Sequence, residues 1–457
     1  MPPQTTFVKN KYIMSINTLK TVLTTCIVAL GATTHAQDAN AQSASFTPCA
    51  ATEYSSYLKS KNIGQTTTQF ESWLAPKLSE TATLRSGQST NQVVSLPVVI
   101  HIIHDGDEVG ISENIPDARI LSQLQVLNED FRRIQGTPGY VEGNAGTDME
   151  IEFCLAQQDP DGNPTTGITR HNLGKASWNS MEAVDEEMKP ATAWDPTRYI
   201  NIWVCRFGGQ LAQVGGYAYF PEGSGLDGLD EAVSTASIDG LAMSFKAFGT
   251  SDVFPAASYF PEADKGRSAS HEMGHYFGLR HIWGDENSCS ATDFCDDTPA
   301  VSGVHTSCTP ADTCPDSEGA DQIENHMDYT PDACKSIFTA GQKARMWTVL
   351  QNSPRRTSLL TSNGCQAPTA GVNGHSLNSN GTKLYPNPVN DELHITAGSA
   401  LPQSAYVVYN ILGAAVLNGS INAGTDAVID TTKLTQGVYI VTITAQNQSR
   451  SLRFIKE

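Results

Sequence analysis

The chain is short of positive charge and of long apolar runs. Of its 457 residues, 29 are Lys or Arg and 48 are Asp or Glu, which gives a formal net charge of -19. This composition offers no basic field to neutralise phosphates, so a nucleic-acid partner is excluded. Outside residues 15–36 no apolar run approaches the roughly 20 residues that cross a bilayer. We therefore expect no transmembrane segment in the mature protein.

The N-terminal residues divide into two parts by composition. Residues 1–36 are interpreted as a secretory signal peptide, with Met14 as an alternative start, because Lys20 precedes an apolar stretch and Thr34-His35-Ala36 resembles a cleavage site. Residues 37–85 are rich in Ser, Thr and Gln and hold too little apolar surface for a domain. We interpret them as a pro-segment, with helical patches near Tyr54–Leu58 and Phe70–Leu78.

Cysteine is plentiful for a reducing compartment, with ten residues in all. Cys26 lies in the signal peptide, so an odd number remains and at least one thiol lacks an intramolecular partner. Cys49 stands alone in the pro-segment. A thiolate is a good zinc ligand, so Cys49 is a candidate latency ligand. The alternative is that Cys49 pairs with a distant cysteine such as Cys365.

One stretch of the chain reads H-E-x-x-H-x-x-G-x-x-H. His271 and His275 are four residues apart, so both imidazoles of a helix reach one metal ion. Gly278 is expected to end the helix with a positive φ and to return His281 to the metal as third ligand. Glu272 is expected to act as general base on a metal-bound water. The alternative is a helix with incidental histidines.

The residues around this motif predict a mixed sheet with backing helices. Residues 93–103 form an apolar, β-branched strand, in which His101 and His104 are expected to be structural. Residues 118–133 share an apolar helical face. Further strands are expected at 150–155, 199–205, 215–220 and 232–238. Residues 159–163 resemble a calcium loop but lack its glycine and glutamate, so a turn is expected.

The chain after His281 is rich in Cys, Asp and Pro as far as Asn325. Such an irregular region needs disulfides or a metal ion. Its hard oxygen ligands favour a calcium site, and the alternative is a set of ordinary solvated acids; the residues are Glu286, Asp293, Asp296, Asp297 and Thr298.

The last part of the chain changes in composition. Thr339 and Gln342 form a capping box that opens a helix to about Gln351. Residues 366–381 are a Pro/Gly/Asn/Ser linker. Residues 382–457 are expected to form a small antiparallel β-sandwich, with strands at 392–396, 405–409, 427–429, 438–444 and 452–455.

The zinc motif and a downstream methionine resemble the metzincins, and GRSASHEMGHYFGLRHIWGD, CDDTPA, NHMDYTPDAC and FTAGQKARM resemble the pappalysin family. The resemblance covers about residues 86–360. It implies a zinc endopeptidase catalytic domain, assigned to 86–365, with a mixed twisted sheet, an active-site helix and an irregular lower subdomain. The expected fold class is thus α+β, with the C-terminal sandwich added.

The resemblance also implies roles for single residues. His271, His275 and His281 are the zinc ligands and Glu272 the general base. It further implies Met327 as the Met-turn residue, Tyr329 as an oxyanion partner, Asp332 as the S1′ residue that favours Arg or Lys at P1′, Cys49 as the cysteine switch, and Arg85-Ser86 as a maturation site. Calcium near Glu286 and the disulfides Cys289–Cys314 and Cys308–Cys334 are implied too; Cys154, Cys205, Cys295 and Cys365 stay unassigned.

The tail resembles the C-terminal sorting domain of type IX secretion, on the residues Leu384–Pro388, Ile411–Gly413, Gly437–Tyr439 and Arg453–Lys456. This implies export through the periplasm and across the outer membrane of a Gram-negative bacterium by the type IX machinery. The alternative for 382–457 is an ordinary adhesion or carbohydrate-binding sandwich.

Together these features predict a secreted, latent protease that hydrolyses protein or peptide substrates with metal assistance. Zinc polarises the peptide carbonyl, Glu272 moves the proton, and Tyr329 helps to stabilise the oxyanion. The rival function is a non-catalytic surface adhesin with a structural zinc ion, which would have no need of Glu272, Gly278 and Tyr329.

Overall fold

The computed structural model describes residues 45–85, 93–143, 145–224, 233–255, 257–368, 383–410, 414–445 and 448–457. These residues belong to two compact units, a larger one formed by Met1–Leu155 and Gly167–Asn363 and a smaller one formed by Ala156–Thr166 and Gly364–Glu457. The predicted signal peptide, most of the linker and the Ile411–Gly413 motif lie outside the described residues. Within them, every helix is too short or too polar to cross a membrane.

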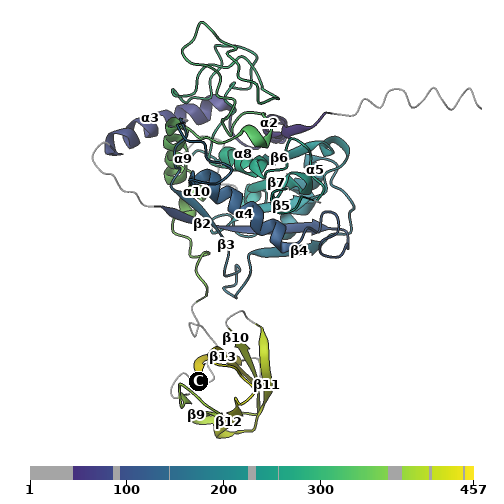
Figure 1. Ribbon diagram of the computed structural model, residues 1–457, viewed down its shortest axis with the longest axis vertical. Helices are drawn as coiled ribbons and strands as arrows, with labels where there is room; N and C mark the ends of the chain where they lie inside the picture. Colours follow the sequence, from purple (N-terminus) through teal and green to yellow (C-terminus); the bar gives the residue numbers. More distant parts are fainter. Residues whose placement is uncertain are drawn as a thin grey trace, which may run out of the picture. The chain divides into compact units, whose positions relative to one another are not determined.

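A mixed seven-stranded sheet forms the centre of the larger unit (Figure 1). Its order is β1-β6-β7-β5-β2-β3, and β4 also pairs with β2. All neighbours are parallel except β6 and β7. The strands are β1 (Thr47–Cys49), β2 (Val94–His104), β3 (Ile151–Leu155), β4 (Ile168–Asn172), β5 (Ile200–Cys205), β6 (Val214–Ala218) and β7 (Gly240–Ser244).

Helices cover this sheet, and the apolar faces of α4 and α8 share one core with its central strands. Ile120 and Leu127 of α4 and Met273 of α8 are buried there with Ile100 and Ile202. The helices are α2 (Ala51–Ser60), α3 (Thr67–Arg85), α4 (Asp117–Phe131), α5 (Met181–Ala183), α6 (Lys189–Thr192), α7 (Val233–Ala236), α8 (Arg267–Tyr276), α9 (Ala340–Asn352) and α10 (Pro354–Leu359).

Most of the predicted elements of this unit are confirmed, within a few residues, by β2, α4, β3, β5, β6 and α9. The capping box of Thr339 and Gln342 is present at α9. The strand predicted at 232–238 is wrong, because Val233–Ala236 is helical and the strand β7 follows at Gly240–Ser244. His101 is buried in β2, where its ring nitrogens contact Thr169 Oγ1 at 2.8 Å and Asn201 Oδ1 at 2.9 Å, as a structural histidine would.

The described part of the predicted pro-segment, here called the N-terminal segment (residues 45–85), is folded onto the larger unit. Its strand β1 extends the sheet by pairing in parallel with β6. Helix α3 packs against α9 through Phe70, Leu74 and Val349. The two predicted helical patches are therefore confirmed as α2 and α3.

The chain between α8 and α9 is mostly irregular and forms the loops at the top of Figure 1. The predicted disulfides Cys289–Cys314 and Cys308–Cys334 are confirmed and tie these loops together. Cys154 and Cys365 are disulfide-bonded as well. Cys49 is a free, buried cysteine, so its pairing with Cys365 is ruled out.

The smaller unit contains two antiparallel sheets, of order β11-β10-β13-β14 and β12-β9-β8. Leu393 and Ile429 of one sheet share a core with Val408 and Val441 of the other, which confirms the predicted β-sandwich. The strands are β8 (Lys383–Tyr385), β9 (Glu392–Leu401), β10 (Ser404–Asn410), β11 (Ala415–Ile421), β12 (Gly424–Asp430), β13 (Gly437–Ala445) and β14 (Gln448–Lys456).

Candidate active site

Helix α8 brings the three histidines of the sequence motif to one point. The Nε2 atoms of His271 and His275 lie 3.1 Å apart, and the Nε2 atom of His281 lies 3.2 Å and 3.0 Å from them. The helix ends at Tyr276, and Gly278 has a φ of 87°, as the motif predicts. This turn returns His281 to the helix face, because only glycine adopts such a φ without strain.

The other ring nitrogen of each histidine is held by an acceptor. His271 Nδ1 donates to the carbonyl of His326 at 2.7 Å, and His275 Nδ1 donates to the carbonyl of Leu279 at 2.8 Å. His281 Nδ1 contacts the carboxylate of Asp285 at 2.5 Å. Since a carbonyl only accepts, the Nδ1 proton fixes the tautomer and leaves each Nε2 lone pair directed to the shared point.

Glu272, the residue after His271, lies beside this point and near the Cys49 thiol. The residue is fully buried, and neither carboxylate oxygen has a hydrogen-bond partner among the described residues. Burial raises the pKa of Glu272 to about 8, which the nearby Cys49 thiol and Lys335 ammonium partly oppose. A buried carboxyl of this kind can exchange a proton near neutral pH.

Met327 packs against the helix that carries the histidines. Its side chain is fully buried, and its Sδ atom would lie 2.4 Å from a Cβ placed on Gly274 of α8. Glycine at position 274 therefore lets the methionine approach the helix that carries the histidines. The turn is held by the Met327 amide, which donates to Asn325 Oδ1 at 2.9 Å.

Two aromatic side chains border the histidines. The Trp283 ring stacks on His281 with 4.3 Å between centroids and 8° between planes. The Tyr329 ring lies 4.9 Å from that of His281, and its hydroxyl donates to the backbone carbonyl of Cys49 at 2.8 Å. Burial raises the pKa of Tyr329 well above its usual range, so the phenol keeps its proton and remains a donor.

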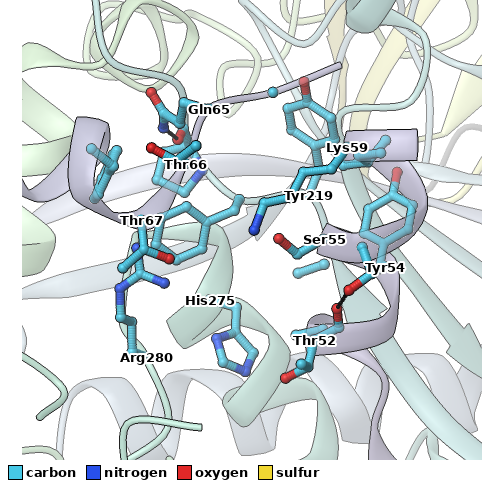
Figure 2. Close-up of a pocket in the computed structure, with 18 of the residues that line it drawn as sticks. Thr52, Tyr54, Ser55, Lys59, Gln65, Thr66, Thr67, Tyr219, His275 and Arg280 are labelled. Atoms are coloured by element: carbon cyan, nitrogen blue, oxygen red, sulfur yellow. Dashed lines mark hydrogen bonds between the residues drawn. The ribbon is translucent and has the colours of Figure 1, made fainter. Parts of the chain in front are cut away.

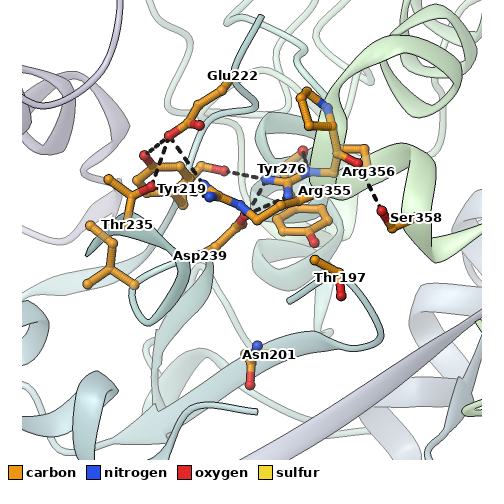
Figure 3. A network of polar contacts seen from close by, with 12 residues as sticks. Thr197, Asn201, Tyr219, Glu222, Thr235, Asp239, Tyr276, Arg355, Arg356 and Ser358 are labelled. Atoms are coloured by element: carbon orange, nitrogen blue, oxygen red, sulfur yellow. Dashed lines mark hydrogen bonds and ion pairs between the residues drawn. The ribbon is translucent and has the colours of Figure 1, made fainter. Parts of the chain in front are cut away.

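A buried ion-pair network holds the C-terminal end of α8 (Figure 3). Asp239 is fully buried and accepts hydrogen bonds from Arg355 and Arg356. Arg356 Nε also donates to the carbonyl of Tyr276 at 2.8 Å, and its guanidinium lies 3.4 Å from the Tyr276 ring centroid. Asp239 thus positions the arginine that caps the zinc-motif helix.

Asp332 holds the opposite end of the same helix. Its Oδ2 atom accepts from the amides of Arg267 at 2.9 Å and Lys265 at 3.1 Å, which satisfies the helix N-terminus. Asp332 is 1% exposed, and the buried Lys335 supplies a compensating positive charge. The structure therefore gives Asp332 a helix-capping contact that the sequence did not predict.

Cys49 of the N-terminal segment completes a cluster of four metal-binding side chains. Its Sγ atom and one ring nitrogen of each of His271, His275 and His281 lie within 4.8 Å of one another. Cys49 is fully buried, and its pairing opposite Gly216 of β6 fixes its position. Three imidazoles and a thiol are a donor set that suits zinc.

A cavity of about 210 Å³ lies between the N-terminal segment and the histidine motif (Figure 2). His275 and Arg280 line it from one side, and Thr52 and Thr67 line it from the N-terminal segment. Phe220, in the chain just after β6, forms another wall. The N-terminal segment therefore covers a space that begins at His275 and His281.

The predicted calcium ligands are not gathered into a comparable cluster. Among the described residues, the second group of acidic or metal-binding side chains lies elsewhere, at Asp105, Asp107 and Glu113. Asp297 instead accepts from Thr339 Oγ1 and the Gly341 amide, both at 2.7 Å, at the start of α9. Asp285 and Trp283 contact His281 but were not predicted from the sequence. The i, i+4 spacing of His281 and Asp285 was the available signal for Asp285.

Family comparisons match both units of the chain. The Peptidase M43 family, described as pregnancy-associated plasma protein-A, matches residues 182–351. The secretion system C-terminal sorting domain matches residues 383–457. The first match contains the histidine motif, and the second contains the C-terminal sandwich.

Several curated relatives are extracellular metalloproteases of fungi. The relative from Pyricularia oryzae is 30% identical over 268 residues, which are 58% of this chain and 76% of the relative. The relative from Podospora anserina is 29% identical over 300 residues, which are 63% of this chain and 86% of the relative.

Solved structures with the same fold include mature mirolysin of Tannerella forsythia in complex with a cleaved peptide. That structure is 37% identical with a TM-score of 0.51, and the match covers 60% of this chain and 97% of mirolysin. Mirolysin in complex with compound 9 is 36% identical with a TM-score of 0.50 and covers 59% and 97% of the two chains.

Proposed function

Because the chain belongs to the pappalysin family of metzincin metalloendopeptidases and carries a type IX secretion sorting domain, we propose that it is a secreted zinc endopeptidase that is made as a latent precursor. The observation that carries the catalytic role is the convergence of three Nε2 atoms beside a buried, unpartnered Glu272 carboxylate. A binding protein with a structural zinc ion, the rival function, has no use for such a carboxylate.

His271, His275 and His281 would hold the zinc ion through Nε2, with Nδ1 fixed as described above. The ion supplies Lewis acidity at the peptide carbonyl and lowers the pKa of water. Glu272 takes a proton from the attacking water and passes it to the leaving amine. Among the described residues its buried carboxylate oxygens have no hydrogen-bond partner that would compete for this proton.

Tyr329 is proposed to stabilise the oxyanion. Support comes from its hydrogen bond to the backbone carbonyl of Cys49, whose thiol belongs to the group of four side chains that could hold the zinc ion. A substrate carbonyl that replaced it would meet a donor that is already oriented. Met327 is proposed as the Met-turn residue under the metal.

Latency is proposed to come from the N-terminal segment. Cys49 would fill the fourth zinc position, and β1 occupies the edge of β6 on which an extended substrate would add as a strand. Gly215 supports this close approach, because a Cβ there would lie 2.4 Å from the Pro48 carbonyl oxygen. Cleavage at Arg85-Ser86, at the end of α3, would release the segment; Ser86 lies outside the described residues.

A preference for Arg or Lys at P1′ is proposed from Asp332. One of its oxygens is used at the start of α8, so the other would meet the basic side chain of the substrate. Lys335 opposes this preference with its own buried charge. Profiling of cleavage products tests the proposed preference. An apolar or acidic residue at P1′ would reject the role of Asp332.

A structural calcium ion is proposed for the segment of residues 286–298. Support comes from Asp293, whose Oδ2 atom is buried without a hydrogen-bond partner in the described part of the chain. Glu286, Asp296, Asp297 and Thr298 are the further proposed ligands, although Asp297 and Thr298 already make protein hydrogen bonds. A bound divalent ion would lower the raised pKa of Asp293, now about 6.

We propose that the type IX machinery recognises the C-terminal sandwich after the chain passes through the periplasm, and the match to a secretion sorting domain supports the recognition. Protein or peptide substrates outside the cell are proposed from the likeness to extracellular metalloproteases. The proposed segments of the chain are a signal peptide (1–36), a pro-segment (37–85), the catalytic domain (86–365), a linker (366–381) and the sorting domain (382–457). The sandwich would be removed on arrival.

The catalytic proposal is tested with Glu272→Ala in the processed, zinc-loaded protein, from which the N-terminal segment has been removed. We expect zinc content, measured by atomic absorption, to stay unchanged while cleavage of casein or gelatin falls about 100-fold or more, as for loss of a general base. A chelator should abolish cleavage by the unaltered protein. Near-normal turnover by the variant would reject Glu272 as the base.

A further inference from the structure

One carboxylate of the N-terminal segment is bound by two arginines of the catalytic domain. Glu71 of α3 accepts from Arg345 Nη1 at 2.8 Å and Nη2 at 2.6 Å, and from Arg280 Nε at 2.8 Å. The side chains of Glu71, Arg280 and Arg345 are 12%, 15% and 1% exposed. This is a bidentate, largely desolvated carboxylate site, the geometry in which guanidinium groups bind most specifically.

The two arginines are fixed by the catalytic domain and not by Glu71 alone. Arg345 Nε donates to the carbonyl of Gly278 at 2.7 Å, so its two Nη groups point outward to the N-terminal segment. The Arg280 guanidinium lies 4.8 Å from the centroid of the Phe220 ring. Contacts within the catalytic domain therefore help to hold the carboxylate site in shape.

The site adjoins the cleft in which cleavage is proposed to occur. Arg280 immediately precedes the metal ligand His281 and lines the same cavity as His275 (Figure 2). Phe220 lines this cavity too, and the Phe70 ring of the N-terminal segment packs on it with 4.9 Å between centroids. Phe70 of the N-terminal segment thus packs on Phe220, and the adjacent Glu71 binds Arg280 and Arg345.

Resting on the proposed function, we propose that Arg280 and Arg345 form a subsite of the mature protease that binds a Glu or Asp side chain of the polypeptide substrate. Glu71 occupies this subsite in the precursor. When the N-terminal segment leaves, the two guanidiniums lose their shared carboxylate but keep donor groups that match another one. Asp285 and Asp293 also face them, but Asp285 is bound to His281 and Asp293 to Thr298. An incoming carboxylate restores the lost contacts.

The first test is a binding measurement on the processed, zinc-loaded protein. A fluorescent peptide of residues 66–80 is compared with its Glu71→Gln version, and anisotropy reports affinity without any turnover. We expect the Gln peptide to bind at least about 30-fold more weakly, since a buried charge pair loses one partner. Equal affinities of the two peptides would overturn the proposal, whether or not the protein cleaves anything.

The second test asks whether substrates use the subsite. In a neutral peptide substrate each position is changed in turn to Glu or Gln, and the ratio of kcat/KM for Glu over Gln is measured. We expect a ratio of about 10 or more at one position, falling close to 1 in Arg280→Gln and staying high in Arg132→Gln, whose guanidinium pairs with Asp148 and Glu152. Arg345→Lys keeps the charge but loses the bidentate contact, so it should lower the ratio partly.

These arms separate the possible failures. A ratio near 1 at every position, with the neutral peptide still cleaved, shows that the arginines only anchor the N-terminal segment and overturns the inference alone. Failure to cleave any peptide, with zinc bound, overturns the proposed function, and the binding comparison then still decides on the carboxylate site.

Discussion

Glu71 is predicted to be the strongest polar anchor of α3, and Glu71→Gln tests this in the intact precursor. Gln keeps the shape of the side chain but removes the charge that Arg280 and Arg345 share. Removing one partner of a buried ion pair costs about 3–5 kcal/mol. We take the lower end, about 3 kcal/mol, because the Glu71 side chain retains some solvent contact.

This magnitude predicts a large change in local opening. Since about 1.4 kcal/mol corresponds to a factor of ten, amides of α3 should exchange with solvent about 100-fold faster in the variant. Hydrogen exchange read by mass spectrometry measures this directly. Glu80→Gln is the matched control, because Glu80 is an exposed residue of the same helix. An increase below about tenfold for Glu71→Gln would refute the anchoring role.

The same contact gives a pH dependence of defined sign. The two arginines lower the pKa of Glu71 from its usual value, so its contribution to docking is present above the unfolded pKa, roughly 4.3. It is lost as the pH falls below that value and through the lowered pKa. The protection factors of α3 amides, which correct for the intrinsic exchange rate at each pH, should therefore fall below about pH 4.3 in the unaltered precursor and approach those of Glu71→Gln.

Three further predictions concern the anchors and supports of the site. Cys49→Ala should give the uncleaved precursor partial activity on casein, because the fourth zinc position opens while the contacts of α2 and α3 remain, and unchanged latency would remove Cys49 as the fourth ligand. Asp239→Asn should lower the free energy of unfolding in urea by about 3–5 kcal/mol, because Arg355 and Arg356 lose their buried charged acceptor. The control is Asp316→Asn, a substitution of an exposed residue. A loss below about 1 kcal/mol for Asp239→Asn, on the order of a surface substitution, would contradict the role of the network. Gly274→Ala should cost about 1–3 kcal/mol and lower Tm, because its Cβ would meet Met327 Sδ, and a calorimetric Tm equal to that of the unaltered protein would contradict the close packing.

The sequence predicted the elements whose pattern is set by local physics. The apolar run of β2, the amphipathic face of α4 and the capping box of α9 each carry a local pattern that indicates their element. The spacing of the zinc motif likewise specified which side chains converge. The short strand β7 was missed, because Gly240–Ser244 is stabilised by its neighbours β5 and β6 and carries little local signal.

Contacts between distant parts of the chain could not be predicted in the same way. Nothing in the spacing of Asp332 shows that its carboxylate caps α8, since Lys265 and Arg267 lie more than 60 residues earlier. The pairing of Glu71 with Arg280 and Arg345 spans more than 200 residues. Both contacts depend on tertiary packing, which brings together charges that carry no periodic pattern.

The N-terminal segment combines three kinds of anchor that respond to different changes. Cys49 depends on the proposed zinc site, Tyr54 depends on its 2.6 Å hydrogen bond to the buried Asp185, and Glu71 depends on two arginines. Because these contacts lie on β1, α2 and α3 in turn, loss of one leaves the others in place. A segment with too little apolar surface to fold alone is thus held by the domain that it covers, and the proposed cleavage after Arg85 would turn an intramolecular contact into a dissociable one. Release should therefore follow cleavage and not precede it.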